Sequence, residues 1–202
     1  MIDLGLVHRE FPEIKEAARL GRGGFKEVFS GRHESDGLVV LKLILPGKQD
    51  TDQLAREVDA CSSVDCDRVP RVYAHGQVDT ELGALLWIRE QRIVGQSLDD
   101  VLRQAPLSDR ECMRMSLHVG GALAAAEQVN IVHRDVKPGN IMKDESGYWL
   151  LDFGIARHLD LESLTSTKAM WGKGTPGYAP PEQWRAIPKS SSQYPDSSFM
   201  MF

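Results

Sequence analysis

The sequence has little cysteine, and its three cysteines show no ligand spacing. Cys61, Cys66 and Cys112 form neither a Cys-x-x-Cys pair nor a cluster with histidine. An odd number of cysteines without such spacing argues against a disulfide framework and against a structural zinc site. Reduced thiols are typical of the cytosol, so we expect a cytoplasmic protein.

The sequence also lacks long apolar runs and long basic runs. No stretch approaches the roughly 18 apolar residues of a membrane span, and the N-terminal segment MIDLGLVHREFPEIKE has no apolar signal-peptide core. We therefore expect no membrane segment and no export signal. The formal net charge of -5, without a basic run, gives little support to a nucleic-acid partner.

The 202 residues, of which 42% are hydrophobic, are enough for one substantial core or two small ones. Residues 28–45 and 71–94 each alternate around a turn, which predicts two hairpins. Apolar residues at helical spacing over 54–61 predict a helix between them. A further strand is expected before the first hairpin, so the first part of the chain should be rich in sheet.

The pattern becomes helical from Ser97 onward. Residues 98–104 and 109–128 predict two helices, the second with Ser108 as its N-cap and Glu111 three residues on. Two short strands are expected around NIMKD and YWLLDF, and regular periodicity fades beyond them. A sheet-rich part followed by a mainly helical part indicates the α+β class.

Polar residues gather in HRDVKPGN, which follows the second of these helices and precedes a strand. In such a loop, Asp135 could accept a proton and Lys137 could neutralise an anionic group. Asn140 could offer its carbonyl oxygen to a hard cation. Asp152, in LLDFG twelve residues later, would complete a sparse oxygen-ligand site of the kind that magnesium uses with phosphates.

A second constellation lies in LGRGGFKEV, near the N-terminus. Gly21, Gly23 and Gly24 would let backbone amides approach phosphates closely, although a glycine-rich turn alone is as typical of a plain hairpin. Lys42, in the strand VVLK, could meet the phosphates. Glu57 lies on the expected helix and could pair with Lys42, whereas taken alone both are ordinary surface charges.

The motifs HRDVKPGN, DFG and GTPGYAPPE, in this order, resemble the catalytic loop, metal-binding loop and P+1 region of the eukaryotic-type serine/threonine protein kinases, in particular the bacterial ones. Chance occurrence of HRDxKPxN in a chain of this length is on the order of one in a hundred thousand or rarer. The alternative is a solvated loop with ordinary turn residues. The resemblance covers about residues 14–185.

The resemblance implies a two-lobed α+β fold. Residues 1–95 would form a sheet-rich N-lobe, residues 96–185 an incomplete helical C-lobe, and residues 186–202 an irregular tail. A complete domain of this family runs to roughly 250 residues or more, so we expect the chain to stop after the APE-like element PPE and to lack about the last third of the fold. The chain alone could therefore be inactive.

The resemblance also implies the catalytic roles. Asp135 would orient the substrate hydroxyl and accept its proton, and Lys137 would stabilise charge on the transferring phosphoryl group. Asn140 and Asp152 would hold Mg²⁺. Lys137, together with Thr175 in GTPGY, is typical of serine/threonine kinases, so the expected partner is a protein substrate with Ser or Thr hydroxyls.

ATP would lie between the lobes, with Lys42 on its α- and β-phosphates and paired with Glu57. Apolar residues would enclose the adenine, and their alternative role as plain core is compatible because adenine pockets are mostly apolar. The other expected ATP-binding residues are Leu20, Gly21, Gly23, Gly24, Val28, Val40 and Met142.

Two positions depart from the family pattern, and one loop suggests regulation. Lys26 replaces the third glycine of GxGxxGxV, and Glu90 or Gln91 stands where the hinge region usually has an apolar residue.

Arg134 could dock a phosphate that orders the loop after the DFG motif. The candidates, which could equally be ordinary exposed loop residues, are Thr165, Ser166 and Thr167.

Three functions are open from the sequence. The expected one is an ATP-dependent serine/threonine protein kinase. A non-catalytic ATP-binding decoy or scaffold module is the alternative, because the implied missing helices would weaken turnover although the motif residues are intact. A small-molecule phosphotransferase of related fold is disfavoured by GTPGYAPPE, a peptide-positioning signature that such enzymes generally lack.

Overall fold

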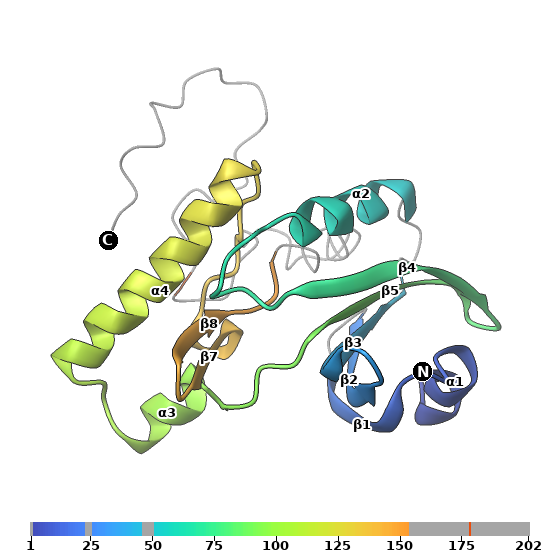
Figure 1. The fold of residues 1–202 in the computed structure, drawn as a ribbon, viewed down its shortest axis with the longest axis horizontal. Coiled ribbons are helices and arrows are strands. Elements are labelled where there is room, and N and C mark those ends of the chain that lie inside the picture. The colour runs from blue at the N-terminus through green and yellow to red at the C-terminus, as the bar shows by residue number, and fades with distance from the viewer. Residues whose placement is uncertain (1, 23–25, 46–50, 154–177, 179–202) are drawn as a thin grey trace, which may run out of the picture.

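The computed structural model describes residues 2–22, 26–45, 51–153 and 178, without the side chains of residues 51–54 and 57. In this part of the chain, a five-stranded sheet precedes a three-stranded sheet, and α-helices pack against both (Figure 1). The structure thus has the sheet-rich first part and the more helical second part that the sequence predicts.

The first sheet is antiparallel and has the strand order β1-β2-β3-β5-β4. Helix α2 (Thr51–Ser62) connects its third and fourth strands along the chain. Both predicted hairpins and the helix between them are therefore confirmed. The strands are β1 (Lys15–Arg22), β2 (Lys26–His33), β3 (Gly37–Ile44), β4 (Val72–Thr80) and β5 (Gly83–Gln91).

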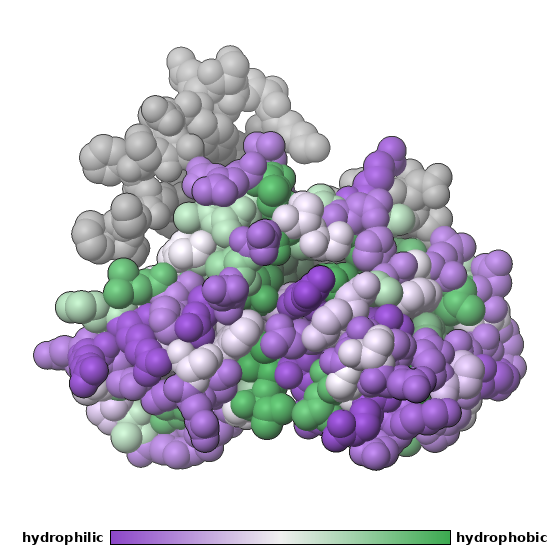
Figure 2. Space-filling model, viewed as in Figure 1, coloured by the Kyte–Doolittle hydropathy of each residue, from purple (hydrophilic) through white to green (hydrophobic). Residues whose placement is uncertain are grey.

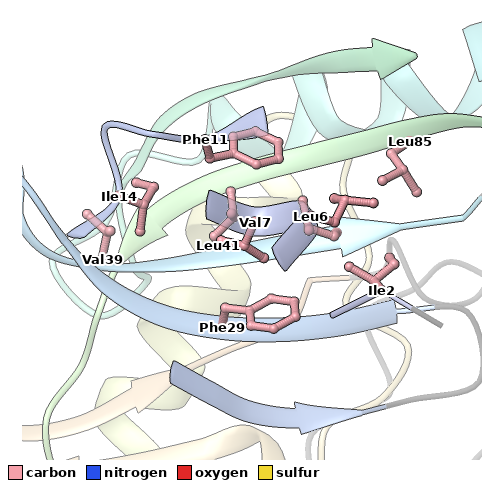
Figure 3. Close-up of a cluster of buried hydrophobic side chains, with 10 residues drawn as sticks. Ile2, Leu6, Val7, Phe11, Ile14, Phe29, Val39, Leu41 and Leu85 are labelled. Atoms are coloured by element: carbon pink, nitrogen blue, oxygen red, sulfur yellow. The ribbon is translucent and has the colours of Figure 1, made fainter. Parts of the chain in front are cut away.

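Helix α1 (Leu4–Glu10) is an element that sequence reasoning missed. Its N-cap is Asp3, whose Oδ1 accepts a hydrogen bond from the backbone N–H of Leu6 at 2.9 Å. The helix packs on one face of the first sheet and forms a buried apolar core with it (Figure 3). This core consists of Ile2, Leu6, Val7, Phe11, Ile14, Phe29, Val39, Leu41, Leu43 and Leu85.

The side chains of strand β3 point alternately to the two faces of the sheet, as successive side chains of a strand do. Leu41 and Leu43 belong to the core under α1, whereas Lys42 lines a cavity on the other face. Ile44, on that same face, packs with Val58 of α2. Helices α1 and α2 accordingly lie on opposite sides of the sheet (Figure 1).

The second part follows the predicted order of short strands and helices. Ser108 caps α4 as expected, since its Oγ accepts from the backbone N–H of Glu111 at 3.3 Å. The Glu111 carboxylate does not turn back to the cap; it accepts from the Tyr148 hydroxyl and pairs with Lys143 at 2.9 Å. The elements are β6 (Gln96–Ser97), α3 (Leu98–Gln104), α4 (Asp109–Gln128), a 3-10 turn (Pro138–Asn140), β7 (Ile141–Asp144) and β8 (Gly147–Leu150).

A second apolar core lies between α4 and the strands β7 and β8. Its buried members include Ala122 and Ala126 of α4 and Leu150 of β8. Val69, which precedes β4 in the chain, also belongs to this core, and the N–H of Leu150 donates to the carbonyl of Arg68 at 2.8 Å. The predicted division at residue 95 falls between β5 and β6, but the earlier segment helps to build the second core.

Polar residues cover most of the face shown in Figure 2, and the apolar residues there form small groups. On α4, Met113 and Leu117 are 67% and 70% exposed. Among the described residues, no helix combines the length and the apolar character that crossing a bilayer requires.

Leu41→Ala should destabilise the protein by about 2–5 kcal/mol, because Leu41 is fully buried and its truncation leaves a cavity. Leu38→Ala is the matched control, since Leu38 lies on the same strand but is 38% exposed. Urea unfolding of both variants checks this expectation. Equal losses at the two positions would contradict the assignment of the core to one face of β3.

Candidate active site

Residues from three separate motifs surround one cavity of about 310 Å³. The first sheet contributes one wall, β7 and the segment after β8 contribute another, and the end of β5 with the residues that follow it (90–95) closes the edge between them. The cavity brings together six residues that the sequence predicts for ATP or metal binding: Leu20, Val28, Val40, Lys42, Met142 and Asp152.

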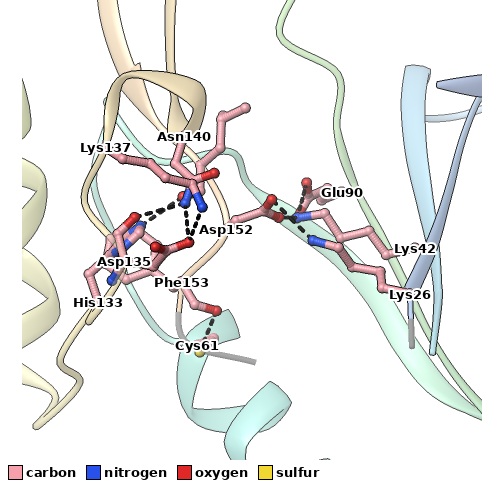
Figure 4. Close-up of polar contacts among 11 residues, drawn as sticks. Lys26, Lys42, Cys61, Glu90, His133, Asp135, Lys137, Asn140, Asp152 and Phe153 are labelled. Carbon is pink, nitrogen blue, oxygen red and sulfur yellow. Dashed lines mark hydrogen bonds and ion pairs between the residues drawn. The ribbon is translucent and has the colours of Figure 1, made fainter. Parts of the chain in front are cut away.

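Lys42 lies at the charged end of this cavity and is only 6% exposed. Its Nζ is 2.6 Å from Oε1 of Glu90 and 2.7 Å from Oδ1 of Asp152 (Figure 4). Burial alone would lower the pKa of Lys42, but the two carboxylates outweigh it and raise the pKa above its ordinary value. Lys42 is therefore a fixed cation.

Asp152 meets a second ammonium group, that of Lys26, whose Nζ is 3.0 Å from its Oδ2. Burial would raise the pKa of Asp152, but Lys42 and Lys26 together hold it well below its usual range. The residue has a φ of 59°, a conformation that aspartate tolerates better than most side chains. Asp152 is thus ionised, and each of its oxygens faces a cation.

The structure shows which of the two hinge-region residues pairs with Lys42. Glu90, and not Gln91, pairs with Lys42, while the Gln91 side chain accepts from the backbone N–H of Arg71 at 3.4 Å. Burial raises the pKa of Glu90 against the opposing effect of Lys42. Sequence reasoning did not assign Glu90 or Lys26 a partner at this site, although both stood out as departures from the family pattern.

The three predicted residues of the HRDVKPGN loop meet one another. The Asn140 Nδ2 donates to the backbone carbonyl of Asp135 at 2.8 Å and to its Oδ2 at 2.9 Å. Lys137 Nζ lies 2.7 Å from the same Oδ2. The Asp135 side chain stays 41% exposed, so a carboxylate held by two neighbours faces the outside of the loop.

His133 is a residue whose role sequence reasoning missed, although it heads the motif. It is 1% exposed, its Nε2–H donates to the carbonyl of Leu151 at 2.7 Å, and its Nδ1 accepts from the N–H of Asp135 at 3.3 Å. These two bonds assign the proton to Nε2. Burial lowers the pKa of His133, so the ring is neutral and fixes the loop against the segment before Asp152.

Several predicted site residues lie outside the described part of the chain, and their roles stay predictions. Glu57 belongs to helix α2, but its side chain is not described. Gly21 is within the described part of the chain. It lies near the end of β1 and pairs with Val28 of β2. The predicted residues outside the described ranges are Gly23, Gly24, Thr165, Ser166, Thr167 and Thr175.

The buried neutral state of His133 predicts an acid-sensitive fold. An unfolded histidine takes up a proton near pH 6.5, whereas His133 in the fold resists it, so its contribution is present above about pH 6.5 and is lost as the pH falls below that value. Between pH 7 and 5, the free energy of unfolding should fall with a slope of at most about 1.4 kcal/mol per pH unit from this group.

His133→Gln should flatten that slope while keeping a side-chain N–H donor. Urea unfolding of both proteins across this pH range measures the difference, and the other histidines cancel because both proteins contain them. Parallel curves would show that His133 does not titrate differently in the fold.

Comparisons with known proteins match most of the chain. The family model of the protein kinase domain matches residues 14–198, which is further than the residues 14–185 predicted from the motifs. A crystal structure of the Mycobacterium tuberculosis PknI kinase domain is similar with a TM-score of 0.56 and 26% sequence identity, over 68% of this chain and 56% of that one.

The relatives include bacterial serine/threonine-protein kinases. The probable kinase PknB of Bifidobacterium longum is 34% identical over 82% of this chain and 26% of its own length. The kinase pkn3 of Myxococcus xanthus is 35% identical over 83% of this chain and 32% of its own length. The chain thus spans less than a third of each of these relatives. With the family model matched over most of its length, the chain belongs to the protein kinase family.

Proposed function

We propose that the chain transfers the γ-phosphate of ATP to serine or threonine hydroxyls of protein substrates. One observation carries the proposal: a cavity with apolar walls ends at the Lys42–Asp152 pair, and the Asp135 loop is bonded to the residue just before Asp152. A nucleotide site and a proton acceptor would thus adjoin each other. The serine/threonine specificity is supported by Lys137 in HRDVKPGN and by the printed names of the relatives.

The cavity suits a nucleotide in size and in polarity. Its volume of about 310 Å³ lies at the lower end of ligand-pocket volumes, and its apolar walls suit a purine. Val28, Val40 and Met142 would enclose the base, as the family resemblance implies. The cations of Lys42 and Lys26 at the other end suit phosphate oxygens.

The oxygen donors of Asp152 and Asn140 fit a magnesium ion that phosphates help to bind. The Asn140 amide nitrogen makes both of its side-chain bonds to Asp135, so the amide oxygen is the atom that would ligate. Within the described residues, no group of three or more His, Cys, Asp or Glu side chains could hold a metal, so Asp152 and Asn140 would need phosphate and water as further ligands. When bound, Mg²⁺ would neutralise charge on the transferring phosphoryl group.

Asp135 would orient the attacking hydroxyl and accept its proton. Its carboxylate is held by Asn140 and Lys137 and stays accessible, which suits a general base that must meet a protein side chain. Lys137, beside it, would stabilise negative charge on the phosphoryl group during transfer. The chain's contribution to the reaction would therefore be positioning and electrostatics.

A cytoplasmic location is part of the proposal. Cys66 and Cys112 are free thiols in the structure, which suits a reducing compartment.

Asp135→Asn should reduce phosphate transfer by at least about a hundredfold, because the amide cannot accept the hydroxyl proton. Incorporation of labelled γ-phosphate from Mg-ATP, into the chain and into a generic basic protein, is the measurement. Asp79→Asn is the matched control, since Asp79 lies exposed on β4. ATP binding without transfer by the unaltered chain would favour a non-catalytic binding module.

The phosphate should appear on serine and threonine. Acid hydrolysis of the labelled substrate, followed by separation of the phosphoamino acids, tests this. Mainly phosphotyrosine would refute the proposed specificity, and transfer only to a small molecule would point to a phosphotransferase of another substrate class.

A further inference from the structure

We propose that Glu90 is a positioning residue, whose carboxylate holds the Lys42 ammonium group at the phosphate end of the cavity and thereby sets the affinity for ATP. The ATP part of this inference rests on the proposed function. The pairing of Glu90 with Lys42 stands on geometry alone, since the two groups are 2.6 Å apart.

The strand register places Glu90 on the face of Lys42. In β5, Leu86 and Ile88 point into the core under α2, and Glu90 is the next residue of the same alternation. Lys42 lies opposite Ile88 in the ladder, and Val40 lies opposite Glu90. Glu90 is therefore the diagonal neighbour of Lys42, a position from which long side chains reach each other.

Burial makes this contact strong. The side chains of Lys42 and Glu90 are 8% and 12% exposed, so little solvent reaches either charge. Removing one member of such a pair leaves a charge without its closest compensation in a poorly solvated place. Glu90 and Asp152 also balance the two ammonium groups of Lys42 and Lys26.

Glu90 differs from Asp152 in how it is supported. It lies on β5, an inner strand with ladder neighbours on both sides, β3 and β4. Asp152 lies beyond the end of β8 and divides its oxygens between Lys42 and Lys26. If Asp152 were to ligate a metal ion, Glu90 would remain paired with Lys42, because Glu90 lies on a strand that has ladder neighbours on both sides. Asp152 would thus exchange partners when a metal ion binds, whereas Glu90 would not.

The nucleotide experiment compares the 202-residue chain with Glu90→Gln, Glu57→Gln and the exposed control Glu81→Gln. Binding of a fluorescent ATP analogue with Mg²⁺ is titrated, and the KM for ATP and kcat are measured where there is turnover. Glu90→Gln should weaken binding by about tenfold or more and raise KM more than it lowers kcat, because a charge-assisted contact to Lys42 is lost. Glu81→Gln should have no effect.

Binding by Glu90→Gln within twofold of the unaltered chain would overturn the inference, and so would a large effect of Glu57→Gln with none at Glu90. A second measurement does not depend on ATP. In urea unfolding, Glu90→Gln should lower the midpoint when Lys42 is present but not in a Lys42→Met background, because the carboxylate has then lost its partner.

An equal lowering in both backgrounds would contradict the pairing. Absence of nucleotide binding by the unaltered chain would refute the proposed function and the ATP part of the inference. The mutant cycle would in that case still decide whether Glu90 holds Lys42.

Discussion

The alternation of side chains along strand β3 is the constraint on which the rest of the structure depends. Leu41 and Leu43 complete the core under α1, and between them Lys42 points to the opposite face. A slip of one residue would place the ammonium group in the apolar core and the leucines in the cavity. Strands β2 and β5 pair with β3 on both sides, so the same ladder that builds the core also aims the lysine.

Placing a cation at that position has a desolvation cost, which the surrounding carboxylates offset. One of them, Glu90, belongs to the first sheet, and the other, Asp152, follows the second sheet. Lys42 therefore joins two parts of the chain that have separate apolar cores. A phosphate would compete for Lys42 and a metal ion for Asp152, whereas Val69 joins the two parts through apolar contacts in the second core.

Much of the fold was predictable because the patterns that encode it are local. Alternation identified the two hairpins, and Ser108 identified the start of α4. Helix α1 has only seven residues, too few to establish a period, and was missed. The motifs likewise indicated where chemistry would occur, but not that Lys26 reaches Asp152 or that Glu90 reaches Lys42. Those pairs depend on strand register and side-chain reach across the cavity, which no short stretch of sequence contains.

The peptide groups of Leu151 connect the two chemical halves of the site. Its carbonyl accepts from His133 at 2.7 Å, and its N–H donates to the carbonyl of Asn140 at 2.8 Å, so both ends of the HRDVKPGN loop are attached to one residue. The next residue is Asp152, which has a φ of 59° and whose side chain reaches Lys42. A displacement of the HRDVKPGN loop would therefore also move the carboxylate of Asp152, which pairs with Lys42 and Lys26. The backbone of Leu151 therefore couples the position of Asp135 to that of Asp152. Because these bonds involve no side-chain atom of Leu151, a side-chain substitution at this residue leaves them intact.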